Sequence, residues 1–89
     1  MIKETITITN PTGLHLRPAG NLCREAMKYK SKINFTYNSE KSTANAKSVL
    51  SVLGACVKSG DEITLIFEGE DEEEARDHIV DFITNHLTD

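Results

Sequence analysis

The feature that most constrains this 89-residue sequence is that its apolar residues change period several times along the chain. Alternation with a period of two indicates a strand with one buried face, whereas recurrence every three to four residues indicates a helix. Residues 2–10 alternate, the residues from Pro18 onward follow the helical period, and residues 32–38 alternate again. A chain with this pattern must bury the apolar faces of strands against those of helices.

The second half of the chain repeats the switch between the two periods. It contains a turn, a short polar strand, a short helix, a fourth strand and a final helix, at residues 38–41, 42–46, 47–54, 61–69 and 71–87. The predicted order is therefore βαββαβα. We expect an α+β open-faced sandwich, in which three helices pack on one face of a four-stranded antiparallel sheet.

Local signals mark the predicted helix ends. Gly54 stands near the end of the short helix and is expected to close it. Asp71 is expected to cap the final helix, with Glu74 three residues later in the position of a capping box. Ser48 opens the short helix, so its ordinary role is that of an N-cap.

Length and composition indicate one domain, residues 1–89, that is soluble and cytoplasmic. No apolar run approaches the roughly 20 residues that span a bilayer, and the region after Met1 does not resemble a signal peptide. Cys23 and Cys56 lie 33 residues apart among apolar neighbours. We expect free buried thiols in a reducing compartment rather than a disulfide or a metal site.

Charge is distributed unevenly along the chain. The net charge is −4, yet the residues up to Lys58 carry an excess of Lys and Arg. From Ser59 onward the chain is strongly acidic, and Arg76 is its one Lys or Arg there. A local positive field in the first part can steer a negatively charged partner. The scattered basic residues and the acidic total do not favour nucleic-acid binding.

The segment "TGLHLRPAG" carries the candidate chemistry, because it lies where the first strand gives way to the first helix. A helix start presents unpaired N–H groups and the positive end of the helix dipole, which favour an anion. His15 supplies a nucleophile at neutral pH, and Arg17 supplies a permanent cation that suits phosphate oxygens. The alternative is a helix start with ordinary surface polar residues; the pattern alone leaves both open.

Two segments give the chain a specific resemblance. "TITNPTGLHLRPAGNL" resembles the active-site segment of HPr, the histidine-containing phosphocarrier of the bacterial phosphoenolpyruvate-dependent sugar phosphotransferase system. Within it, "GLHLRPA" matches the family pattern Gly-x-His-x-Arg-Pro-Ala. "NAKSVLSVLG" resembles the second family segment, which surrounds a regulatory serine. The resemblance extends over nearly the whole chain, including its length and order of elements.

This resemblance implies roles for individual residues. It makes His15 the phosphorylated residue, through ring nitrogen Nδ1, with Arg17 as the partner of the anion. Ser48 matches the regulatory serine. The resemblance also implies a set of motif and docking residues, namely Leu16, Pro18, Arg24, Met27, Val49 and Leu50. Leu16 departs from the family pattern, in which that position is often small or polar.

The implied function is that of a monomeric phosphoryl carrier without a cofactor, rather than an enzyme. Enzyme I would charge His15, which would pass the phosphoryl group to sugar-specific enzyme IIA components. An HPr kinase/phosphorylase and a catabolite-control transcription factor are the partners implied for Ser48. We expect phosphate on Ser48 to weaken phosphoryl transfer to His15.

Two other functions are compatible with the same segments. One is a regulatory module of the same fold that acts mainly through Ser48. The other is a small hydrolase such as an acylphosphatase, although the glycine-rich loop of that family is absent here. His78 and His86 lie on the final helix, where Glu74 and Asp81 could join His78 in a metal site. Carboxylates around a surface histidine are common on an acidic helix, so we expect no metal there.

Overall fold

The computed structural model describes residues 1–87 and places them in four strands and three α-helices, the last of which continues as a π-helix. The elements are β1 (Ile2–Thr7), α1 (Leu16–Ala26), β2 (Lys32–Tyr37), β3 (Ser42–Asn45), α2 (Val49–Gly54), β4 (Glu62–Glu68), α3 (Glu72–Asp81) and η1 (Phe82–His86). This is the predicted order. Within residues 1–87, no helix is both long enough and apolar enough to cross a membrane.

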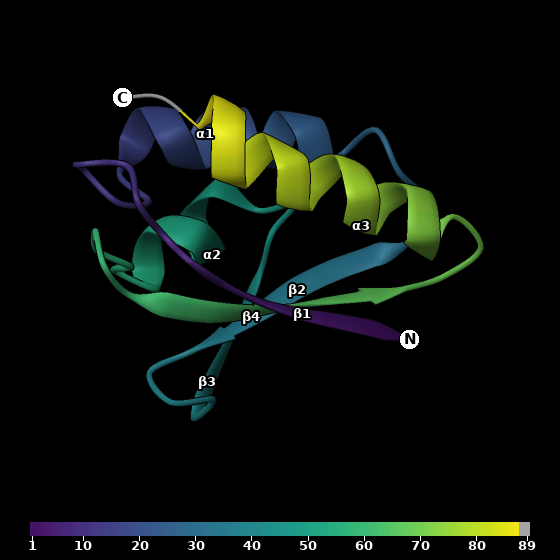
Figure 1. Ribbon diagram of the computed structural model, residues 1–89, viewed down its shortest axis with the longest axis horizontal. Coiled ribbons are helices and arrows are strands. Elements are labelled where there is room, and N and C mark those ends of the chain that lie inside the picture. The colour runs from purple at the N-terminus through teal and green to yellow at the C-terminus, as the bar shows by residue number, and fades with distance from the viewer. Residues whose placement is uncertain (88–89) are drawn as a thin grey trace.

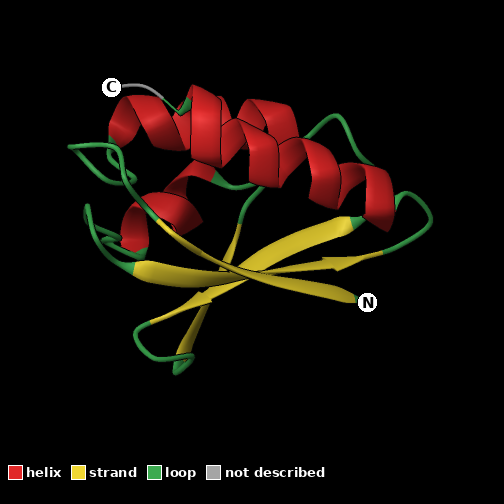
Figure 2. Ribbon diagram, viewed as in Figure 1, coloured by secondary structure: helices red, strands yellow, loops and turns green. Residues whose placement is uncertain are grey.

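The four strands form one antiparallel sheet in the order β1-β4-β2-β3. β4, the last strand in the sequence, lies between β1 and β2 and joins the two halves of the chain (Figure 1). Figure 2 shows the helices on one side of the sheet, while the other side is left uncovered. The predicted α+β open-faced sandwich is confirmed.

The core lies between the helices and the two central strands. Phe35 of β2 lies opposite Leu65 of β4, and Ile33 lies opposite Phe67, so that all four side chains point to the same side. Each is at most 1% exposed, and burying a side chain of this size contributes about 1.5–3 kcal/mol. The helices complete the core with small and branched residues, among them Ala19, Leu22, Ala26, Val52, Ala75 and Ile79.

Asp71 joins the start of α3 to the loop that follows α1. It is the N-cap residue of α3, as predicted, but its side chain makes no capping hydrogen bond. The carboxylate instead accepts hydrogen bonds from the N–H groups of Lys30 and Ser31, each at 2.9 Å, and from the hydroxyl of Ser31. The predicted capping box with Glu74 is therefore wrong, because three donors from a distant loop take the place of the helix's own N–H groups.

The same hydrogen bonds predict an acid-sensitive contribution to stability. They favour the charged carboxylate, chiefly through the Ser31 hydroxyl and then the Lys30 N–H, and lower the pKa of Asp71 from 3.8 to about 2. The unfolded chain takes up the proton first, so this contribution is complete above the unfolded pKa of 3.8 and is lost as the pH falls towards about 2.

We expect Asp71→Asn to unfold more easily than the wild type at neutral pH. The gap in unfolding free energy should narrow between pH 3.8 and about 2, where the wild type loses its carboxylate. Urea titrations followed by circular dichroism at a series of pH values measure this gap. A gap that stays constant across that range would contradict the role given to Asp71.

The end of α2 differs from the sequence prediction at two residues. Gly54 is the last residue of the helix, but the residue in the left-handed conformation is Cys56, with φ 52°. The N–H of Cys56 donates to Leu53 O at 3.1 Å, which closes the last turn. Cys56 is consequently exposed, whereas Cys23 is buried, and burial raises the pKa of the Cys23 thiol. The prediction that both thiols are buried is therefore wrong for Cys56.

Candidate functional site

The loop between β1 and α1 is closed by a turn from Asn10 to Gly13. The Gly13 N–H donates to Asn10 O at 3.1 Å, and the side-chain amide of Asn10 donates to Gly13 O at 2.6 Å. Gly13 has φ 65°, and a Cβ there would lie 2.4 Å from Val57 O, so glycine is required on both counts. The next N–H, that of Leu14, donates to Val57 O at 2.9 Å. His15 therefore follows an anchored stretch of backbone.

His15 is the N-cap residue of α1 and is exposed to solvent. Its backbone is extended, with φ −77° and ψ −172°, and its carbonyl accepts a hydrogen bond from the N–H of Ala19 at 2.8 Å. The helix thus begins at Leu16, two residues before the start at Pro18 that the apolar period predicts. The earlier start places the imidazole at the helix terminus itself.

The first turn of α1 forms an environment that favours anions. The first N–H groups of an α-helix have no carbonyl partner within the helix, and the helix dipole adds positive charge at this end. Arg17 lies in this turn with an exposed side chain, and the turn contains no acidic residue. The structure therefore brings together the three predicted parts of the site: an imidazole, a helix N-terminus and a guanidinium.

Pro18, which the sequence analysis groups with the motif and docking residues, does not belong to an exposed docking surface. Its ring is less than 2% exposed. Pro18 is the third residue of α1, where its missing N–H leaves no intrahelical hydrogen bond unmade, and its apolar ring turns into the core. A partner cannot contact it without unfolding the helix start.

The other residues predicted to contact partners are exposed on α1, at its C-cap and on α2. Leu16 and Met27 are 62% and 65% exposed, and Leu50 is 82% exposed. Val49 is 36% exposed, and Arg24 carries its charge on the solvent side of α1. We refer to Leu16, Met27, Val49 and Leu50 as the apolar surface. Large apolar side chains left exposed to water are a feature of sites where a protein partner binds.

Ser48 is the N-cap residue of α2, as predicted. Its Oγ accepts a hydrogen bond from the N–H of Ser51 at 3.2 Å, and the side chain is half-buried. The hydroxyl of Ser51 in turn accepts a hydrogen bond from the N–H of Asn45 at 2.8 Å. The hydroxyl of Ser48 thus lies at a helix terminus, where a negative charge is electrostatically favourable.

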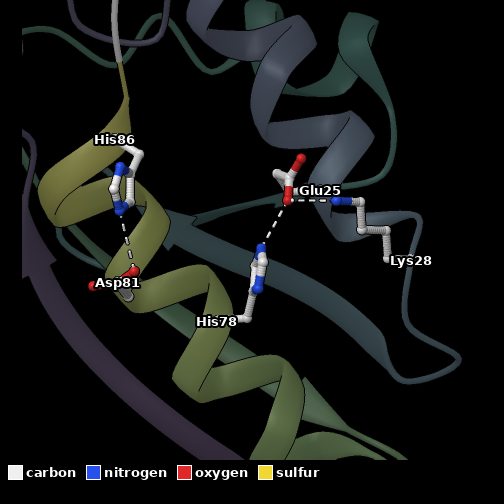
Figure 3. A network of polar contacts seen from close by, with 5 residues as sticks. All are labelled: Glu25, Lys28, His78, Asp81 and His86. Carbon is white, nitrogen blue, oxygen red and sulfur yellow. Dashed lines mark hydrogen bonds and ion pairs between the residues drawn. The ribbon is translucent and has the colours of Figure 1, made fainter.

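His78 takes part in a contact between helices that sequence reasoning missed. Figure 3 shows its ring pointing towards Glu25 of α1, with Nε2 2.7 Å from Oε1. Lys28 lies 3.0 Å from the same oxygen, and the two contacts, that of Lys28 first, lower the pKa of Glu25. His78 and Glu25 are 53 residues apart, so no local pattern could indicate the pair. Within residues 1–87, no three His, Cys, Asp or Glu side chains are arranged to hold a metal ion.

The fold and the site define a class of small open-faced sandwich proteins that expose a histidine at the start of their first helix. The model of one protein family, described as the PTS HPr component phosphorylation site, matches residues 2–85. The chain belongs to the HPr family.

Similar proteins agree with this assignment over almost the whole chain. A phosphocarrier protein HPr from Lysinibacillus sphaericus is 37% identical, covering 94% of this chain and 93% of its own length. The HPr-like protein Crh of Bacillus subtilis is 32% identical, covering 98% and 100%. The crystal structure of HPr-C-His from Thermoanaerobacter tengcongensis has a TM-score of 0.89 at 39% identity, covering 94% and 92%.

Proposed function

We propose that the protein is a cytoplasmic phosphocarrier of the sugar phosphotransferase system. It accepts a phosphoryl group from phospho-enzyme I on Nδ1 of His15 and donates it to sugar-specific enzyme IIA components. The observation that carries the proposal is the exposed His15 at the N-cap of α1, inside a segment that the HPr family model matches. The protein is a carrier rather than an enzyme, because it is itself phosphorylated and then passes the phosphoryl group to another protein.

The reaction at His15 is a displacement at phosphorus. The neutral ring attacks through Nδ1, so the new P–N bond forms as the bond between phosphorus and the donor breaks. During transfer the negative charge lies on the equatorial phosphoryl oxygens, which Arg17 and the first-turn amides of α1 stabilise. The product is a phosphoramidate, which remains a good donor. Because the site is exposed to solvent, the phosphohistidine is not stabilised so strongly that the phosphoryl group could no longer be transferred.

The apolar surface, together with Arg24, supplies the docking face for these partners. Leu16 is the residue directly after His15, so a partner that reaches the imidazole must also cover this side chain. Leu50 is the most exposed large apolar residue of the described chain, and α2 packs beside α1. Both the donor and the acceptor must approach His15, and one shared face serves them in turn.

Phosphate labelling tests the proposal directly. The protein is incubated with purified enzyme I and labelled phosphoenolpyruvate, and the protein-bound label is counted. A carrier takes up about one phosphoryl group per chain, in an acid-labile linkage, and loses it when an enzyme IIA component is added. Continuous release of inorganic phosphate without an acceptor would indicate a hydrolase instead.

A second role, regulation through Ser48, is supported by the relatives named Crh. One solved structure of that group, Crh of Bacillus subtilis, is described as a catabolite repression protein and is 31% identical with a TM-score of 0.74. An HPr kinase/phosphorylase would phosphorylate Ser48, and a catabolite-control transcription factor would bind the modified form. A phosphate at the N-terminus of α2 adds a negative charge of about 1.5 to 2 next to Val49 and Leu50 of the apolar surface.

A pair of substitutions at Ser48 separates its capping role from its regulatory role. Ser48→Ala removes the cap and is expected to lower the unfolding free energy by about 1 kcal/mol, with phosphate uptake at His15 unchanged. Ser48→Asp keeps an N-cap acceptor, so it is expected to preserve stability while it slows uptake several-fold through its charge. Thermal unfolding and the labelling rate measure the two effects. Uptake by Ser48→Asp at the wild-type rate would count against the regulatory role.

A further inference from the structure

Asn10 is a polar residue that the fold buries near the candidate site, five positions before His15. It is 9% exposed, although it lies in a loop at the end of the sheet. Its side-chain amide donates to Gly13 O at 2.6 Å. The main chain closes the same turn from the other direction, because the Gly13 N–H donates to Asn10 O at 3.1 Å. A buried side chain that bonds to the main chain three residues ahead fixes the course of the loop.

The hydrogen bond from Asn10 completes a clamp on one peptide group. The carbonyl of Gly13 and the N–H of Leu14 belong to the same planar peptide unit. Asn10 holds the oxygen end, and Val57 O accepts from the nitrogen end at 2.9 Å. With both ends held, this peptide plane cannot rotate without breaking a buried hydrogen bond, and the next peptide leads directly into His15.

The acceptor on the far side of the clamp is itself fixed to the sheet. The loop that contains Val57 is tied to the end of β1 by two main-chain bonds, Gly60 N to Ile8 O at 2.7 Å and Ile8 N to Asp61 O at 2.8 Å. Asp61 also accepts from the N–H of Lys58 at 2.9 Å. The clamp therefore connects the peptide before His15 to the end of the sheet, and the side chain of Asn10 contributes one of its hydrogen bonds.

We propose that Asn10 is a positioning residue for phosphoryl transfer. Its amide sets the Gly13–Leu14 peptide plane and, through it, the direction in which His15 and the first-turn amides of α1 face an incoming phosphoryl group. The inference rests on the proposed phosphorylation of His15. Positioning acts on the reaction rather than on docking, because the apolar surface lies on α1 and α2 and does not include the turn.

Steady-state kinetics of phosphoryl transfer, with the carrier as the substrate of enzyme I, separates positioning of His15, which changes kcat, from docking, which changes KM. We expect Asn10→Ala to lower kcat by roughly tenfold or more with KM unchanged, since small misplacements of reacting groups are costly. The matched control is Asp71→Ala, which removes another side-chain clamp on a loop, at the far end of the 11-residue α1. That variant should lose stability and keep its kcat. An Asn10→Ala protein with wild-type kcat, or with only a raised KM, overturns the proposal.

The isosteric variant Asn10→Asp adds a pH dependence of kcat that a purely structural role of Asn10 would not produce. In Asn10→Asp, a protonated carboxyl donates to Gly13 O, whereas an ionised one repels it. The ratio of wild-type to Asn10→Asp kcat should therefore fall as the pH is lowered, while the ratio for Asn10→Ala stays flat. Parallel profiles for the two variants would mean that the donated hydrogen bond does not position His15.

Amide NMR spectra of the unphosphorylated variants test the inference without any transfer reaction. Asn10→Ala is expected to shift the resonances of Leu14, His15 and Leu16, and Asp71→Ala to leave them in place. Unchanged resonances in Asn10→Ala overturn the positioning role. A wild-type protein that takes up no phosphate contradicts the proposed function instead, and the spectra then decide on Asn10 by themselves.

Discussion

His15→Ala is expected to take up no phosphate from phospho-enzyme I and to remain folded. Without the imidazole there is no nucleophile in the first turn of α1, and an arginine and backbone amides cannot hold a phosphoryl group covalently. The substitution should change the unfolding free energy by no more than about 0.5 kcal/mol, because the ring is exposed and makes no capping hydrogen bond. Labelling and thermal unfolding of the same preparation give the two numbers.

The other two histidines of the chain provide matched controls. His78→Ala loses the contact with Glu25, and His86→Ala loses a 3.4 Å contact with Asp81, but both variants keep the first turn of α1 intact. Each should reach the wild-type level of about one label per chain. If His15→Ala still takes up acid-labile phosphate, the acceptor is another residue, and loss of label in either control would point to that histidine.

The sequence alone predicts the sheet and helices well because their signals are local. The side chains of Ile33, Phe35 and Tyr37 alternate along one strand, and a period of two can be read within seven residues. The apolar period predicts the start of the first helix two residues late, because this period reports the buried face and Leu16 faces solvent. The parts of the candidate site at His15 are also adjacent in the chain, so the sequence predicts that they lie together.

The features that sequence reasoning missed depend on contacts between distant segments. Asp71 was correctly expected at the start of α3, but the partner of its carboxylate lies 40 residues away at Ser31. The Glu25–His78 pair joins α1 and α3, and its two residues are 53 positions apart in the sequence. The sequence predicts Pro18 as a motif residue in the first turn of a helix, and the packing of α1 on the sheet shows that it is buried.

Gly13→Ala is the substitution expected to damage the fold and the site together. An alanine at φ 65° is strained by about 1–3 kcal/mol, and its Cβ would lie 2.4 Å from Val57 O and 2.7 Å from Lys58 Cα. Both contacts are with backbone, so no side-chain rotation relieves them. We expect a loss of roughly 3 kcal/mol or more in unfolding free energy, together with displacement of the peptide that leads into His15.

Substitutions at two other glycines show whether a loss of phosphoryl transfer is caused by displacement of the backbone before His15 or by loss of folding stability. Gly69→Ala meets a similar clash, 2.7 Å from Ser31 Cα at φ 154°, but in the turn before α3. It should lose comparable stability and, at a temperature where it is still folded, phosphorylate at the wild-type rate. Gly20→Ala lies inside α1 with nothing within 4 Å of the new Cβ, and should gain about 0.5–1 kcal/mol.

Urea unfolding and the initial labelling rate, measured on all three variants below their transitions, decide between the two causes. Gly13→Ala should label far more slowly than Gly69→Ala at the same fraction folded, because only the first displaces Leu14 from Val57 O. Equal rates in these two variants would mean that the loop before His15 tolerates movement, and that the imidazole needs only its place at the start of α1. That outcome would be consistent with the carrier function, but it would mean that the backbone of the Asn10–Gly13 turn has no role in phosphoryl transfer.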